Sequence, residues 1–178
     1  MPEIPVIGID PGPEVSHAAL YDGGPCAMAG EYPLPESFIR ANVYSIPSVV
    51  FVVGRCMPQG RPLSGVMIHT IENSIHIATV LDAKGARVYM VPDATARAQL
   101  WTVNRCPGET QDRRIIRELG FRGHLKYRVC NKRGALKITD PQHLQSAHTR
   151  DALVFALFNW GSAANRRYLF PDCLKGGA

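Results

Sequence analysis

The fold of this chain is decided by the run Ser-Val-Val-Phe-Val-Val at residues 48–53. Its apolar residues follow one another without the polar alternation of a strand that faces water on one side. Such a continuous β-branched run is typical of a strand buried on both faces, in the middle of a mixed or parallel sheet. The run therefore predicts a layered protein in which helices cover both faces of a sheet.

The surrounding sequence alternates between predicted strands and predicted helices. Apolar segments bounded by turn signals predict four more strands, at residues 4–9, 17–21, 26–32 and 87–91. Apolar residues at helical spacing predict four helices, at residues 64–83, 94–102, 110–119 and 145–160. Residues 36–45 and 121–143 show no clear periodicity, and the chain from residue 165 is expected to fray. We therefore expect one α/β domain over residues 1–178.

Composition excludes several classes of protein. The chain has 178 residues, of which 46% are hydrophobic, and this is enough to bury a core. No apolar run approaches the ~20 residues that cross a bilayer, and Glu3, Pro5 and Asp10 stand where a signal peptide would be basic and apolar. Five cysteines without a Cys-x-x-Cys pair favour neither a disulfide framework nor a zinc site. We expect a cytoplasmic protein without a membrane partner.

Charge is divided unevenly along the chain. Residues 1–54 contain one base and six acids, whereas residues 87–133 contain eleven bases and four acids. A basic stretch of this density suits a polyanion, because each Lys or Arg that meets a phosphate releases condensed counterions. A solvated basic face explains the same pattern equally well.

Asp10 is the first candidate for chemistry. It ends the first predicted strand and is followed by Pro11 and Gly12, which turn the chain sharply. Ligands of open α/β sheets bind at this end of the strands. The alternative is an aspartate that accepts hydrogen bonds within the turn.

His148 and Asp151 form the second candidate, on the last predicted helix. Their spacing of three residues places both side chains on one helix face. An imidazole and a carboxylate arranged in this way can share a divalent ion. The alternative is an aspartate near a helix start that interacts only with the helix dipole.

Together, three segments of the sequence resemble the RuvC family of Holliday junction resolvases, in the RNase H-like superfamily. They are Ile-Gly-Ile-Asp-Pro-Gly at residues 7–12, the strand and helices of residues 88–119, and His148-x-x-Asp151-Ala-Leu. The short connection before residue 48 is similar to the compact members found in bacteriophages. The resemblance implies an RNase H-like mixed five-stranded sheet flanked by helices. It also implies a homodimer that grips a four-way DNA junction and nicks two opposing strands.

The resemblance also implies a metal centre. Asp10 matches the ligand of the first strand, Asp151 matches the ligand of the last helix, and His148 occupies a position that is Asp or His in different members. Two Mg²⁺ or Mn²⁺ ions held there would polarise the attacking water and stabilise the leaving 3′-oxygen. Carboxylate oxygens suit Mg²⁺, and a histidine nitrogen favours Mn²⁺.

The sequence departs from the family pattern at one acidic position. The family has a glutamate at the end of the fourth strand, but Gly54 and its neighbours carry no carboxylate. The nearest downstream acid is Glu72, inside the predicted helix. Either Asp10, His148 and Asp151 suffice, or Glu72 reaches the site, or the protein has low activity.

DNA contacts are implied for five arginines. Arg97 lies in the segment that resembles the phosphate-contacting stretch of the family, and Arg113 and Arg114 lie on the next helix. Arg55 and Arg61 lie in the loop that in this family approaches the junction centre. Solvated surface arginines are the alternative.

Three functions agree with these observations. The first is a metal-dependent endonuclease that resolves four-way junctions. The second is a junction-binding protein that cuts weakly or not at all because the glutamate is missing. The third is an RNase H-like enzyme that acts on RNA or RNA–DNA hybrids. For the expected homodimer, the helix at residues 64–83 is the candidate interface, because Met67, Ile71 and Ile75 can leave apolar surface beyond the sheet.

Overall fold

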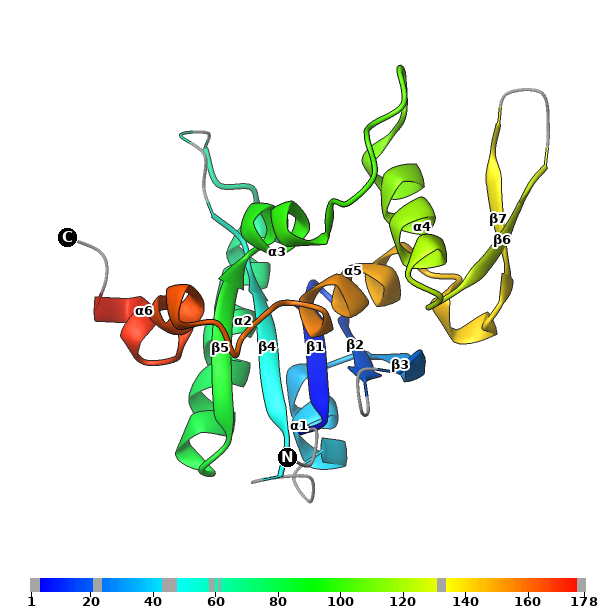
Figure 1. The fold of residues 1–178 in the computed structure, drawn as a ribbon. Coiled ribbons are helices and arrows are strands. Elements are labelled where there is room, and N and C mark those ends of the chain that lie inside the picture. The colour runs from blue at the N-terminus through cyan, green and yellow to red at the C-terminus, as the bar shows by residue number, and fades with distance from the viewer. Residues whose placement is uncertain are drawn as a thin grey trace.

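A mixed sheet of five strands forms the centre of the protein in the computed structural model (Figure 1). In spatial order the strands are β3 (Cys26–Tyr32), β2 (Val15–Leu20), β1 (Val6–Pro11), β4 (Val50–Arg55) and β5 (Arg87–Pro92). The β3–β2 and β2–β1 pairs are antiparallel, and the β1–β4 and β4–β5 pairs are parallel. The structure describes residues 4–20, 24–42, 48–57, 60, 62–130 and 134–175. The predicted RNase H-like mixed sheet is confirmed.

Strand β4, which lies between β1 and β5, has the burial expected of the apolar run. Each residue from Val50 to Val53 is at most 1% exposed. Val50 and Val52 belong to the core on one face of the sheet, while Phe51 and Val53 belong to the core on the other. Because both faces are covered, this strand needs no polar alternation.

Helices cover the two faces of the sheet. On one face pack α1 (Pro35–Asn42) and α2 (Gly65–Ala83); on the other pack α3 (Asp93–Leu100), α4 (Gln111–Phe121) and α5 (Ala147–Ala156). A Cβ at Gly8 would overlap the backbone of Ala152 and Ala156, so α5 crosses β1 at very short range. This close crossing sets α5 beside the end of β1.

Within the described part of the chain, no helix is both long and apolar enough to span a membrane.

Two segments that show little pattern in the sequence have regular structure. Residues 35–42 form α1, and β6 (Lys126–Val129) pairs with β7 (Leu136–Asp140) in an antiparallel ribbon. A helix of two turns and strands of four and five residues are too short to establish a period. The sequence predicts no regular element in either segment, so the structure differs from the prediction there.

The C-terminal segment has regular structure at residues 163–168 and 172–175, contrary to the expected fraying. After the short 3-10 helix η2 (Gln142–Leu144) and α5, the chain forms η3 (Ala163–Tyr168) and α6 (Asp172–Lys175). Asn165 is buried, and the backbone N–H of Phe170 donates a 2.8 Å hydrogen bond to the carbonyl of Val88. The segment therefore lies along the outer edge of the sheet, beside β5 (Figure 1).

Candidate active site

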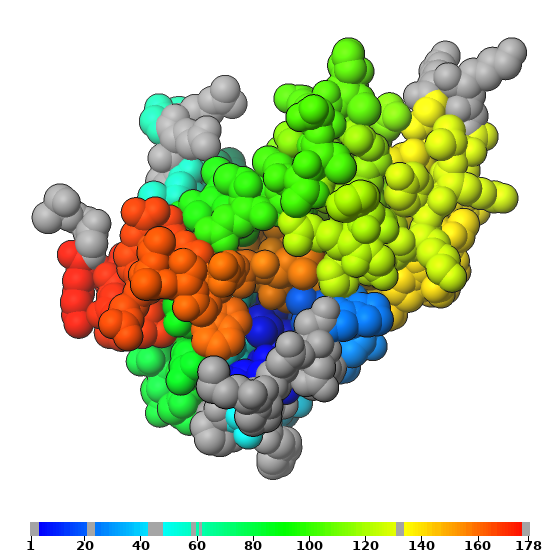
Figure 2. Space-filling model, in the orientation of Figure 1, coloured from blue at the N-terminus to red at the C-terminus, as the bar shows by residue number. Residues whose placement is uncertain are grey.

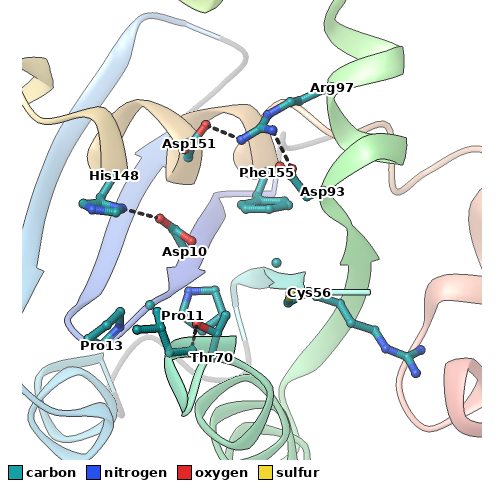
Figure 3. Close-up of a pocket in the computed structure, with 14 residues that line it drawn as sticks. Asp10, Pro11, Pro13, Cys56, Thr70, Asp93, Arg97, His148, Asp151 and Phe155 are labelled. Atoms are coloured by element: carbon teal, nitrogen blue, oxygen red, sulfur yellow. Dashed lines mark hydrogen bonds and ion pairs between the residues drawn. The ribbon is translucent and has the colours of Figure 1, made fainter. Parts of the chain in front are cut away.

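A pocket of about 290 Å³ lies at the edge of the sheet where the parallel strands β1, β4 and β5 end (Figure 3). Carboxyl ends of parallel strands are the usual ligand-binding edge of open α/β sheets. Polar and charged side chains reach this pocket from β1, from the end of β4, from the start of α3 and from α5. They include Asp10, Arg55, Asp93, Arg97, His148 and Asp151.

Asp10 stands on β1, one residue before the strand ends. Its Oδ2 atom lies 3.0 Å from Nδ1 of His148, which is hydrogen-bond distance. Burial raises the pKa of Asp10 above its ordinary value, although contact with His148 acts in the opposite direction. The carboxylate therefore lies in a partly desolvated place with a nitrogen donor beside it.

Asp151 and His148 reach the pocket from the first turns of α5. Ser146 caps this helix by accepting a hydrogen bond from the N–H of His148. Burial raises the pKa of Asp151 to about 6; Arg97 lowers it and the negative charge of Asp10 raises it further. The structure thus brings the three predicted ligands Asp10, His148 and Asp151 to one pocket (Figure 3).

Arg97 lies inside this pocket, between two carboxylates. Its Nη1 atom is 2.5 Å from Oδ2 of Asp93, and its Nη2 atom is 3.0 Å from Oδ1 of Asp151. The amide of Gln111, oriented with its oxygen toward the guanidinium, lies 2.8 Å from Nε. Only 19% of the Arg97 side chain is exposed. As placed, the guanidinium neutralises protein carboxylates, so a role in contacting DNA phosphate stays a prediction.

Asp93 is the pocket residue that the sequence analysis missed. It is the first residue of α3 and directly follows β5, which is parallel to β4. The helix predicted at residues 94–102 begins one residue after Asp93, so Asp93 falls in the predicted connection. The available signal was its position after a strand next to the buried run, since parallel strands end at one edge.

A side chain from α5 fills the space where the missing glutamate would lie. Gly54 is on β4 and lines the pocket, but a Cβ there would collide with the ring of Phe155 from α5. Phe155 is itself 3% exposed and fixed in the core. The sequence has no acid at this position, and the Phe155 ring fills the space that a side chain at Gly54 would take.

Glu72 does not line this pocket. Its side chain is 64% exposed and lies 3.3 Å from His69 on the same helix. From α2 the pocket receives Val66 and Thr70 instead. The structure therefore gives no support to Glu72 as a ligand.

The other arginines expected to bind DNA have different surroundings. Arg55 lines the pocket, Arg113 is half-buried on α4, and Arg61 lies outside the described residues. Arg114 stacks on Trp101 with its guanidinium carbon 4.2 Å from the ring centre, and it donates a hydrogen bond to the carbonyl of Val103. Arg114 thus has a structural role, and none of these contacts tests DNA binding.

The pocket contains suitable metal donors that are engaged with protein cations. Among the residues that the structure describes, no three His, Cys, Asp or Glu side chains are gathered around one point as metal ligands. Asp93 and Asp151 instead contact Arg97, and Asp10 contacts His148. Their carboxylates and imidazole have the chemistry that Mg²⁺ and Mn²⁺ take. The donors therefore fit such an ion in kind, and an ion at Asp151 would compete with Arg97.

Comparison with known proteins identifies the fold. No protein-family model and no curated protein matches the sequence. Among solved structures, Thermus thermophilus RuvC in complex with Holliday junction substrate matches with a TM-score of 0.56 at 16% identity, over 94% of this chain and 98% of that chain. Another Thermus thermophilus RuvC structure matches with a TM-score of 0.53 at 13% identity, over 85% of this chain and 90% of that chain. The chain has a RuvC-like fold.

Proposed function

We propose that the protein is a structure-selective DNA endonuclease that cuts four-way junctions by metal-dependent hydrolysis of phosphodiester bonds. The observation that carries this proposal is the meeting of Asp10, His148 and Asp151 in one pocket at the carboxyl edge of a RuvC-like sheet. Asp10 and His148 are 138 residues apart in sequence and lie at hydrogen-bond distance. Support for a junction as substrate comes from the similar fold of Thermus thermophilus RuvC, which has been seen with a Holliday junction.

In this proposal Asp10, Asp151 and His148 hold Mg²⁺ or Mn²⁺, and we expect two ions. Such ions supply a polarised water and stabilise charge on the leaving oxygen. Burial strengthens the electrostatic interactions of both carboxylates, since fewer water dipoles screen them. Phe155 forms an apolar wall of the pocket and excludes water from that side.

Asp93 is the residue that we propose in place of the missing glutamate. It directly follows β5, which neighbours β4, and it lines the same pocket as Asp10 and Asp151. Its negative charge raises the pKa of both of these carboxyls, so the three groups interact electrostatically within the pocket. This assignment gives the pocket three carboxylates from three different elements.

We further propose that the protein acts as a homodimer through α2. A four-way junction has two opposed scissile strands, and a two-fold axis presents one active site to each. Of the three residues expected at the interface, Ile75 is 44% exposed, whereas Met67 and Ile71 are half-buried; Val66 and Ile68 add exposed apolar surface. Sedimentation at micromolar concentration should give a particle of twice the 19.6 kDa chain mass, and monomers alone would contradict this.

The cleavage proposal is tested with a labelled four-way junction and either Mg²⁺ or Mn²⁺. Asp10→Asn and Asp151→Asn should each lower cutting by more than about 100-fold, because even outer contacts to metal ligands commonly cost 10- to 100-fold. Junction binding in EDTA should persist in both variants. Asp82→Asn, which changes a carboxylate on the last turn of α2, is the matched control. Cutting that survives both pocket substitutions would refute the assignment.

A second function, junction binding without efficient cutting, is favoured by a separate observation. The ring of Phe155 fills the place beside Gly54, and Arg97 already occupies two carboxylates. Tight and selective junction binding, with no nicking in either metal at any protein concentration, would support this function over the first.

A further inference from the structure

The β6–β7 ribbon has two chemically different faces. In its register Tyr127 pairs with Ile138 and Val129 with Leu136, which places four apolar side chains on one face. This face turns toward α4: Ile138 is 3% exposed, and a Cβ at Gly120 of α4 would collide with the Tyr127 ring. The ribbon is therefore anchored to the body by its apolar face.

The opposite face presents two cations directly across from each other. Arg128 pairs with Lys137, and both residues are exposed. Neither side chain forms an ion pair or hydrogen bond with any residue in the described part of the chain. Like charges directly opposite on neighbouring strands destabilise a ribbon. Folding alone therefore gives no reason for this pair, but an anion from outside the chain would.

The ribbon region also holds all of the excess positive charge of the protein. Residues 121–140 contain six bases and one acid, a net charge of +5 that equals the formal net charge of the whole chain. The single acid, Asp140, is opposite Lys126 at the base of the ribbon, away from the Arg128–Lys137 pair. The residues that connect the two strands, 130–135, contain no acid.

The ribbon projects from one side of the molecule, beyond α4 (Figures 1 and 2). We propose that its outer face, with Arg128 and Lys137, contacts the phosphate backbone of a duplex arm of DNA. Only the identity of the polyanion rests on the proposed function. Because phosphates carry no sequence information, this contact positions the duplex without reading its sequence.

The test compares the salt dependence of DNA binding in EDTA. If both cations meet phosphates, Arg128→Gln with Lys137→Gln should reduce the slope of log affinity against log salt by about 1.8, and wild type should then lose about 12-fold more affinity than the variant between ~50 and ~200 mM salt. Arg40→Gln with Lys84→Gln removes the same charge from exposed positions on α1 and at the end of α2. This control should keep the wild-type slope. An unchanged slope in the ribbon variant would overturn the proposal.

A single charge reversal separates binding from folding. Arg128→Glu creates an opposite-charge pair with Lys137, so it should raise the melting temperature of the free protein while lowering its affinity for duplex DNA. A fall in both quantities would show that Arg128 acts through the fold and would overturn the proposal.

The same variants distinguish this inference from the cleavage proposal. If the wild type cuts no junction but the ribbon variant shows the reduced slope, the cleavage proposal is wrong and the ribbon contact is supported. If the wild type cuts junctions and both proteins have the same slope, the cleavage proposal is supported and the ribbon contact is wrong.

Discussion

Asp151→Asn should make the stability of the protein less dependent on pH, because burial raises the pKa of this carboxyl from 3.8 to about 6. Between these two values the folded protein still holds a proton that the unfolded chain has released. Folding is therefore favoured at the acid end of this range, and the free energy of unfolding falls as the pH rises through the folded pKa.

The size of the effect follows from the same shift. A difference of about two pKa units corresponds to about 3 kcal/mol over the full titration. Between about pH 5 and pH 8 the free energy of unfolding should fall by about 1.4 kcal/mol. The rest of the effect is lost below about pH 5, where the unfolded chain releases its proton while the folded protein keeps it. The side chain is 23% exposed, so solvent screening leaves most of this energy in place.

The assay is urea unfolding at these two pH values, without divalent ions, for wild type, Asp151→Asn and Asp82→Asn. Wild type and Asp82→Asn both retain the Asp151 carboxyl. Their free energy of unfolding should therefore fall by about 1.4 kcal/mol more than that of Asp151→Asn on going to the higher pH. The same pH dependence in all three proteins would show that Asp151 titrates normally and would refute the reasoning.

Three further predictions concern the pocket and one buried carboxylate outside it. Gly54→Glu should lower the melting temperature because its Cβ meets the Phe155 ring, and adding Phe155→Ala should restore part of the loss and increase Mg²⁺ affinity measured by calorimetry. Arg97→Gln should bind Mn²⁺ several-fold more tightly in the absence of DNA, because it releases two carboxylates; unchanged affinity would contradict this competition. Glu118→Ala should lower the free energy of unfolding by at least about 2 kcal/mol in urea, because this buried carboxylate accepts three hydrogen bonds from residues 102–103, whereas Glu118→Gln should cost less.

The parts of the fold that sequence predicts are those with strong local patterns. Residues 49–53 are buried, and β4 lies between β1 and β5 inside the sheet, as the unbroken apolar run predicts. The helix predicted at residues 64–83 corresponds to α2, which is long enough for its spacing to be unambiguous. The β6–β7 ribbon escaped prediction because its strands are short and its apolar face is completed by α4.

Sequence predicts the site residues that have a local signal, and it does not predict those that only the folded chain brings to the pocket. Asp10 and the His148–Asp151 pair carry their own local signals, a turn after a strand and a spacing of one helix turn. Asp93 has no such signal and enters the pocket only because β5 lies parallel to β4. The engagement of Arg97 with Asp151 is equally non-local, since 54 residues separate the two.

If the protein binds DNA as proposed, its charges must meet two opposing requirements. The pocket brings Asp10, Asp93 and Asp151 to the place where a phosphate has to arrive, and three carboxylates repel a polyanion. Arg97 reduces this repulsion from within, because one guanidinium contacts two of the three. Long-range attraction must then come from elsewhere, and the ribbon region holds a net charge equal to that of the whole chain. It follows that ribbon substitutions should change affinity and its salt dependence with little effect on cutting at saturating protein, whereas Asp10 and Asp151 substitutions should do the opposite.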